Sequence, residues 1–297
     1  MRCLRFLIIL VVVLGVMGSL AAYAATNQDV SVFKGDDPTE DGIALGGWGS
    51  GTAAKSKEKI LDGGWSIKMS TQSLYSGGRM DFTQPVTLFS NGIDTSRYIQ
   101  FSFFFKDTQV INPASGTDYT WTDVEPYTMP RANKVRFVFI SDTGLAVSAE
   151  EPTQPLDPDD NWVRIAVPLA KFKVKEGITE FRMKRLLIFT DVPTTALYLG
   201  EIKIVTDDKP IKVDPLDPRT VAVMDPQFFV ASATAGVSGL KYSWDFDDSD
   251  GIQSESTEKI AKYIYTRGGV YNVTLTVSDV DGLKEPVTVK AQIEVTD

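Results

Sequence analysis

The sequence Lys241-Tyr-Ser-Trp-Asp-Phe-Asp-Asp248 decides the fold of the last third of the chain. Aromatic and polar residues alternate along it, and this alternation predicts a β-strand with one buried and one solvated face. The same alternation returns in residues 271–277 and 287–295. Several half-buried strands separated by Gly and Asp predict a small antiparallel β-sandwich.

The 241–248 stretch resembles the signature of the polycystic-kidney-disease (PKD) domain, in which a Trp-Asp-Phe strand enters a Gly-Asp-Gly turn. Residues 263–282 follow with the family's order and spacing, although Asp247 and Ser249 replace the turn glycines. The resemblance implies an immunoglobulin-like β-sandwich over residues 215–297, with Trp244 in its core. It also implies a spacer or protein-contact module of extracellular proteins.

The preceding residues 27–207 show the same kind of alternation and predict a second all-β domain. The strands expected from it are 65–69, 98–105, 134–139, 162–167, 186–190 and 197–205. Two proline-containing connections, 107–131 and 150–161, are expected to be long loops. Residues 208–219 carry three prolines among charges and predict a semi-rigid linker, part of which is expected to form the first strand of the second domain.

Four segments of this domain resemble the galactose-binding-like jelly-roll modules of extracellular carbohydrate-binding proteins. They are Gly64–Met69, Asp94–Ile99, Asn161–Leu169 and Tyr198–Ile202. The resemblance implies a jelly-roll β-sandwich that binds glycans. Gly200 stands where many such modules carry a calcium-ligating acid, so we do not expect their usual calcium site.

Composition excludes several classes of function. The only cysteine is Cys3 and there is no histidine, which excludes Ser-His-Asp sites and histidine-ligated zinc. The net charge of −9 argues against nucleic acid as a partner and favours neutral ligands. No motif points to a catalytic carboxylate pair, so we expect no enzyme. We expect no cofactor, with structural calcium on acidic runs such as 36–41 and 157–160 as the alternative to solvated loops.

Residues 1–24 read as a signal peptide. Arg2 and Arg5 precede an apolar run that closes with Ala22-Tyr-Ala24. We expect cleavage after Ala24 and export to the periplasm, the cell surface or the medium. An uncleaved membrane anchor is the alternative, because the run from Phe6 is just long enough to span a bilayer.

A glycan site pairs exposed rings, which stack on sugar faces, with polar side chains that bind hydroxyls. The rings that lie in Gly-, Pro- or acid-rich loops are Trp48, Tyr75, Tyr119, Trp121 and Tyr127. Arg79 and Asp81 follow the Tyr75 loop and could supply hydrogen bonds. We therefore predict a neutral poly- or oligosaccharide ligand. The alternatives are rings that merely pin loops, and a structural or adhesive cell-envelope protein that binds protein partners.

Overall fold

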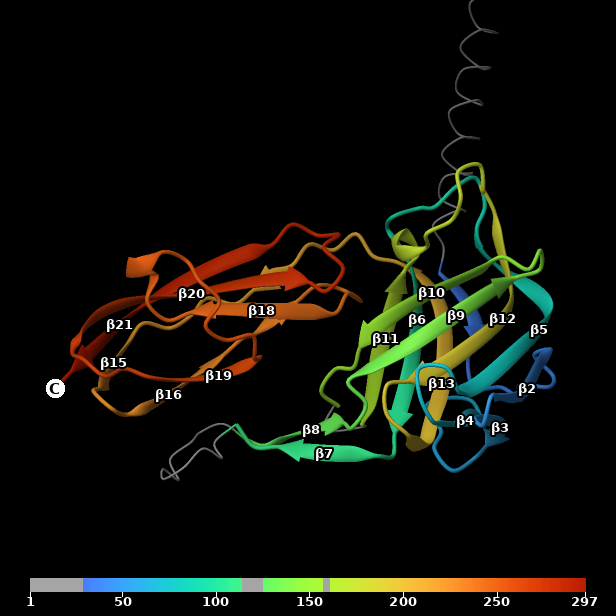
Figure 1. The fold of residues 1–297 in the computed structure, drawn as a ribbon, viewed down its shortest axis with the longest axis horizontal. Coiled ribbons are helices and arrows are strands. Elements are labelled where there is room, and N and C mark those ends of the chain that lie inside the picture. Colours follow the sequence, from blue (N-terminus) through green and yellow to red (C-terminus); the bar gives the residue numbers. More distant parts are fainter. Residues whose placement is uncertain (1–28, 114–124, 157–160) are drawn as a thin grey trace, which may run out of the picture.

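The computed structural model describes residues 29–113, 125–156 and 161–297, and almost all of its regular structure is β-strand. Two β-sandwiches follow one another along the chain (Figure 1). The expected signal peptide lies outside the described residues. Within the described part of the chain, no helix has the length and apolar character needed to cross a membrane.

The N-terminal sandwich is a jelly roll, as the sequence predicts. Its first sheet has the order β11 (Trp162–Pro168), β6 (Arg97–Phe105), β13 (Thr194–Thr206), β4 (Ser66–Thr71), β3 (Thr52–Ser56), with β1 (Val30–Phe33) also on β13. Its second sheet has the order β10 (Ala146–Pro152), β9 (Lys134–Ser141), β12 (Phe181–Thr190), β5 (Gly77–Phe89), β2 (Ile43–Trp48). Apart from the hairpins β3–β4 and β9–β10, successive strands of the sandwich thus alternate between the two sheets, as in a jelly roll.

The core of this sandwich is aromatic and follows from the alternation. Along β9, Val135, Phe137 and Phe139 are fully buried while the residues between them are partly exposed. Phe137 stacks on Phe101 of the opposite sheet with ring centroids 4.4 Å apart. Interdigitated rings of this kind close the space between the sheets.

Three strands occupy segments that the sequence predicts as loops. The connection 107–131 contains the hairpin of β7 (Thr108–Ile111) and β8 (Tyr127–Pro130), and β10 extends to Pro152. The sequence does not predict β5, because Gly77-Gly78 and Pro85 interrupt the alternation of apolar and polar residues in this segment. A proline is tolerated there because β2 pairs with β5 only as far as Phe82, so its absent N–H costs no bond to β2.

The C-terminal sandwich has one four-stranded sheet and two small ones. The large sheet is β15 (Arg219–Ala222), β21 (Val287–Thr296), β20 (Gly269–Asp279), β18 (Leu240–Asp245). The pairs are β16 (Pro226–Val230) with β19 (Ile260–Ile264), and β14 (Lys212–Val213) with β17 (Ala233–Thr234). Two short 3₁₀ turns, η1 (Leu169–Lys171) and η2 (Asp248–Asp250), complete the structure. Trp244 is fully buried and its Nε1 donates to the Glu258 carbonyl at 2.9 Å.

Much of the expected linker is built into the C-terminal sandwich. Ile211 is 4% exposed and belongs to the core around Trp244, and β14 follows it directly. The two sandwiches are therefore joined by few free residues, and their contact depends on side chains.

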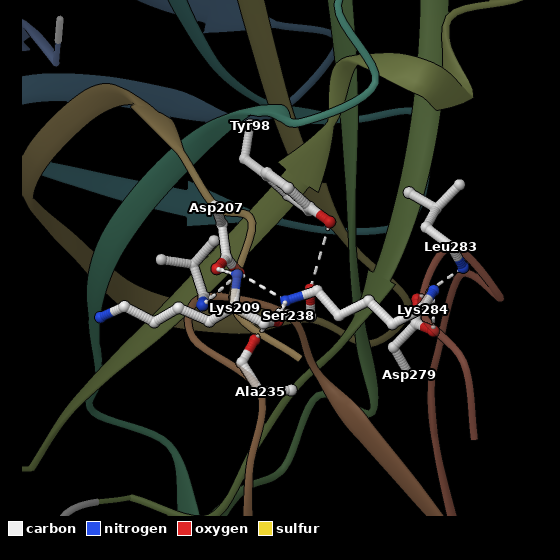
Figure 2. Close-up of polar contacts among 9 residues, drawn as sticks. Tyr98, Asp207, Lys209, Ala235, Ser238, Asp279, Leu283 and Lys284 are labelled. Carbon is white, nitrogen blue, oxygen red and sulfur yellow. Dashed lines mark hydrogen bonds and ion pairs between the residues drawn. The ribbon is translucent and has the colours of Figure 1, made fainter. Parts of the chain in front are cut away.

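The largely buried side chain of Lys284 contributes to the contact between the two sandwiches (Figure 2). Lys284 Nζ donates to Asp207 Oδ2 at 2.7 Å, to the Ala235 carbonyl at 2.7 Å and to the Lys209 carbonyl at 2.8 Å. Asp207 follows β13 and also accepts the Val237 N–H at 2.8 Å. All three protons of the ammonium are thus satisfied, so the charge is tolerated in a buried place.

Candidate functional site

The outer face of the five-stranded sheet gathers four of the seven predicted site residues. Arg79 and Asp81 alternate with the buried Met80 and Phe82 on β5, so both point outward. Trp48 ends β2, opposite Gly77 of β5. We call this surface the ring–arginine face and define it by Trp48, Tyr75, Arg79, Asp81, Arg136 and Arg185.

Both rings of this face stand in solvent. Trp48 is 41% exposed and Tyr75 is 71% exposed. Their loops are tied together by Ser76, whose hydroxyl donates to the Trp48 carbonyl and accepts the Ser50 N–H at 2.9 Å. Gly49, with φ +63°, makes that approach feasible, because a Cβ there would lie 2.9 Å from the Ser76 hydroxyl. The segments that carry the two rings are therefore joined by one local hydrogen-bond network.

Arg136 of β9 contacts the Tyr75 ring. Its guanidinium lies 4.6 Å from the ring centroid, and its Nη1 donates to the Leu74 carbonyl at 3.0 Å. A cation–π contact together with a hydrogen bond restricts the ring's motion. The sequence interpretation missed Arg136, although the alternation in β9 already placed it on the polar side.

Asp81 bridges two arginines on the same face. It accepts a hydrogen bond from Arg185 Nε of β12, and Arg79 Nε lies 3.0 Å from its other oxygen. The Arg79 Nε proton is buried yet makes no aligned hydrogen bond within the described part of the chain. The guanidinium packs on Gly46, where a Cβ would come within 2.8 Å of Nη2. Arg185 was also missed by the sequence interpretation.

Apolar side chains of β12 lie between these charged groups. Leu187 and Phe189 alternate with the core residues Leu186 and Ile188, so they face outward, yet they are only 3% and 2% exposed. Leu187 lies opposite Arg79 of the neighbouring strand β5, and Phe189 lies opposite Arg136 of the neighbouring strand β9. The long arginine stems cover these residues. The face thus combines rings, an apolar base and cationic donors.

Of the remaining predicted ring residues, Tyr127 lies in the described part of the chain, and it does not join this face. Tyr127 lies in β8, and its pKa is raised by burial and by the Glu258 carboxylate of the C-terminal sandwich. The β7–β8 hairpin runs out alongside that sandwich (Figure 1). Tyr119 and Trp121 lie outside the described residues.

Buried carboxylates elsewhere have structural partners. Asp245 accepts the N–H groups of Asp247 and Gln253, and Asp279 accepts those of Leu283 and Lys284. No cluster of three or more Asp, Glu, His or Cys able to hold a metal occurs among residues 29–113, 125–156 and 161–297. The 157–160 acidic run falls outside these ranges.

Comparisons with known proteins add a family for one part of the chain. No curated protein matches the sequence. Among solved structures, the chain is similar to the C-terminal family 22 carbohydrate-binding module of Clostridium thermocellum Xyn10B, with 12% identity, 55% of this chain and 84% of that one covered, and a TM-score of 0.30.

Two further solved structures are similar at the same level. The CBM22-1 xylan-binding domain of Paenibacillus barcinonensis Xyn10C has 12% identity, with 60% of this chain and 92% of that one covered, and a TM-score of 0.33. A family 30 carbohydrate-binding module has 13% identity, with 61% and 99% covered, and a TM-score of 0.33. Similarities this low transfer no ligand to this chain. The family model of the PKD domain matches residues 208–295, and the C-terminal sandwich is therefore a PKD domain.

Proposed function

We propose that this protein binds carbohydrate through the ring–arginine face of its jelly roll. The observation that carries the proposal is the pair of exposed rings, Trp48 and Tyr75, on one sheet face beside arginine guanidinium groups. Sugars present apolar ring faces and many hydroxyls, so they need both kinds of group. Rings that are already fixed lose little conformational entropy on binding.

The charge of the face bears on the kind of glycan. The chain as a whole is acidic and predicts a neutral ligand, but this face sets Arg79, Arg136 and Arg185 against the single carboxylate of Asp81. Arginine forks match carboxylate geometry. We therefore extend the proposal from neutral glycans to glycans that carry carboxylates.

The proposed role is non-catalytic and extracellular. The buried carboxylates described above hold turns and strand ends in place, and the PKD domain suits a spacer that carries a binding module. The expected signal peptide supports export. A single shallow face desolvates few ligand atoms, so the affinity is expected in the micromolar to millimolar range.

The test is a glycan screen followed by titration of the strongest ligand. Trp48→Ala and Tyr75→Ala should each weaken binding by about tenfold or more, which corresponds to about 1.4 kcal/mol. Tyr127→Ala is the matched control, since it removes a ring from another element. Binding of a carboxylated glycan should weaken as ionic strength rises, whereas binding of a neutral one should not.

Two results would overturn the proposal. Unchanged affinity in both ring variants, with folding intact, would remove this face from the site. Absence of binding to every neutral and acidic glycan would favour the adhesive alternative, in which the jelly roll contacts protein.

A further inference from the structure

A cavity of about 380 Å³ lies between the two sandwiches. The jelly roll contributes Gln100, Glu151 and Arg164 to its wall, and the PKD domain contributes residues 233–240 and Tyr242. Its volume lies within the range of small-molecule sites, which occur preferentially at domain interfaces. It lies on the junction side of the jelly roll and shares no residue with the ring–arginine face.

Gln100 is the best indication that the cavity takes a ligand. It sits on β6 between Ala166 of β11 and Lys203 of β13, and it is only 8% exposed. Its side chain lines the cavity, and no hydrogen bond from the carboxamide to another described residue is seen. The carboxamide is accessible from the cavity, so its two donors and its acceptor are available to a group bound there.

Glu151 is the second polar group of the wall. It is 2% exposed, and its Oε1 accepts from Lys171 Nζ at 2.7 Å. Lys171 also pairs with Asp281 of the PKD domain at 2.6 Å. Burial raises the pKa of Glu151 to about 7, partly offset by Lys171. Near neutral pH its carboxyl group can therefore either accept or donate a hydrogen bond.

Tyr242 is the third polar group of the cavity and belongs to the PKD domain. Burial raises its pKa, so its hydroxyl stays protonated, and no hydrogen bond to that hydroxyl is found in the described ranges. Ala166, Val237 and Leu240 supply apolar surface between the polar groups. The cavity therefore offers both hydrogen-bond donors and hydrogen-bond acceptors around an apolar patch.

The charges of the wall are either paired or exposed, which disfavours an ionic group beside the buried Gln100 and Glu151. The negative charge of Glu151 is already countered by Lys171, and the two cations of the lining, Arg164 and Lys259, are both exposed. A buried ion in the ligand would lack a counter-charge and would be disfavoured. A neutral molecule with several hydroxyl groups fits the remaining groups best.

We propose that this cavity is a second binding site, which takes one neutral sugar unit or a disaccharide between the jelly roll and the PKD domain. Gln100, Glu151 and Tyr242 hydrogen-bond its hydroxyls. Because both sandwiches contribute to the wall, a bound sugar stabilises the contact between them. The site is independent of the ring–arginine face and does not require that face to function.

The experiment uses the full chain and a panel of neutral mono- and disaccharides, namely glucose, galactose, xylose, maltose and cellobiose. Calorimetry measures binding, and hydrogen exchange detects protection of residues 233–240. At least one sugar should bind and protect this segment. Gln100→Leu, which keeps the volume and removes the amide, should weaken that binding by about tenfold or more. Gln292→Leu on the outer side of β21 is the matched control and should bind as wild type does.

The variant Tyr242→Phe removes a single hydroxyl and serves as a second probe if Gln100→Leu folds poorly. Trp48→Ala should leave protection of 233–240 unchanged, which separates this site from the ring–arginine face. The proposal is overturned if no sugar of the panel protects 233–240. It is equally overturned if the Gln100 or Tyr242 variant, correctly folded, binds as tightly as wild type.

Discussion

Lys284→Met is the most informative test of the junction between the sandwiches. The Lys284 and Asp207 side chains are 10% and 2% exposed, so the substitution leaves a carboxylate buried without its cation. Two carbonyls, those of Lys209 and Ala235, also lose their donor. Breaking a buried pair by removing one partner costs about 3–5 kcal/mol. The Asp207 carboxylate keeps the N–H groups of Val237 and Lys209, which places the expected loss near the lower value, about 3 kcal/mol.

Urea unfolding of the full chain measures this loss. With a denaturant slope of about 3 kcal/mol per molar, a change of about 3 kcal/mol lowers the midpoint by about 1 M. Lys68→Met is the matched control, because the Lys68–Glu58 pair is exposed and should contribute about 0–1 kcal/mol. The double variant Asp207→Asn with Lys284→Met should recover most of the loss, since neither charge then remains buried.

Hydrogen exchange locates the effect. In Lys284→Met, faster exchange should appear in the segments around 207–211, 235–238 and 283–287, where the ammonium and the carboxylate are bonded. An unfolding midpoint of Lys284→Met equal to that of Lys68→Met would refute the reasoning, because it would mean that the Asp207 carboxylate is solvated in solution.

Three further predictions concern the same chain. Trp244→Ala should cost about 3–5 kcal/mol in urea unfolding, because a fully buried ring is lost, whereas the exposed Lys241→Ala should change little; a loss under about 1 kcal/mol would show that the ring is not core. The folded state holds the Glu151 proton more tightly than the unfolded state does, since the pKa rises from 4.5 to about 7, so its stabilising effect is complete below pH 4.5 and disappears as pH rises through about 7. Urea midpoints across neutral pH should show this decline in wild type and lack it in Glu151→Gln, and an identical decline in both would assign it to other groups. A fragment from Asp207 to Asp297 should unfold cooperatively by itself, because its core around Trp244 is separate from that of the jelly roll, and a disordered fragment would contradict this.

Most of the fold can be predicted from local alternation. Each expected strand lies wholly or largely within a strand of the structure, for example 134–139 within β9 and 287–295 within β21. Alternation works there because successive side chains of a strand point to opposite faces, so the pattern of apolar residues reports burial directly. Strands with glycine or proline, such as β5, or with adjacent rather than alternating apolar residues, such as β7, give no such pattern.

The candidate site could be predicted only in part. The sequence alone placed Arg79 and Asp81 next to the Tyr75 loop and marked Trp48 and Tyr75 as exposed rings. It could not bring Arg136 and Arg185 to them, because alternation determines which face a residue takes but not which strand lies beside it. It could not show the interdomain cavity either, since the proline-rich segment 208–219 reads as a linker. Strand order and domain contact depend on pairing between segments far apart in the chain, so only the tertiary structure decided that Tyr75 lies over Arg136 and that Lys284 reaches Asp207.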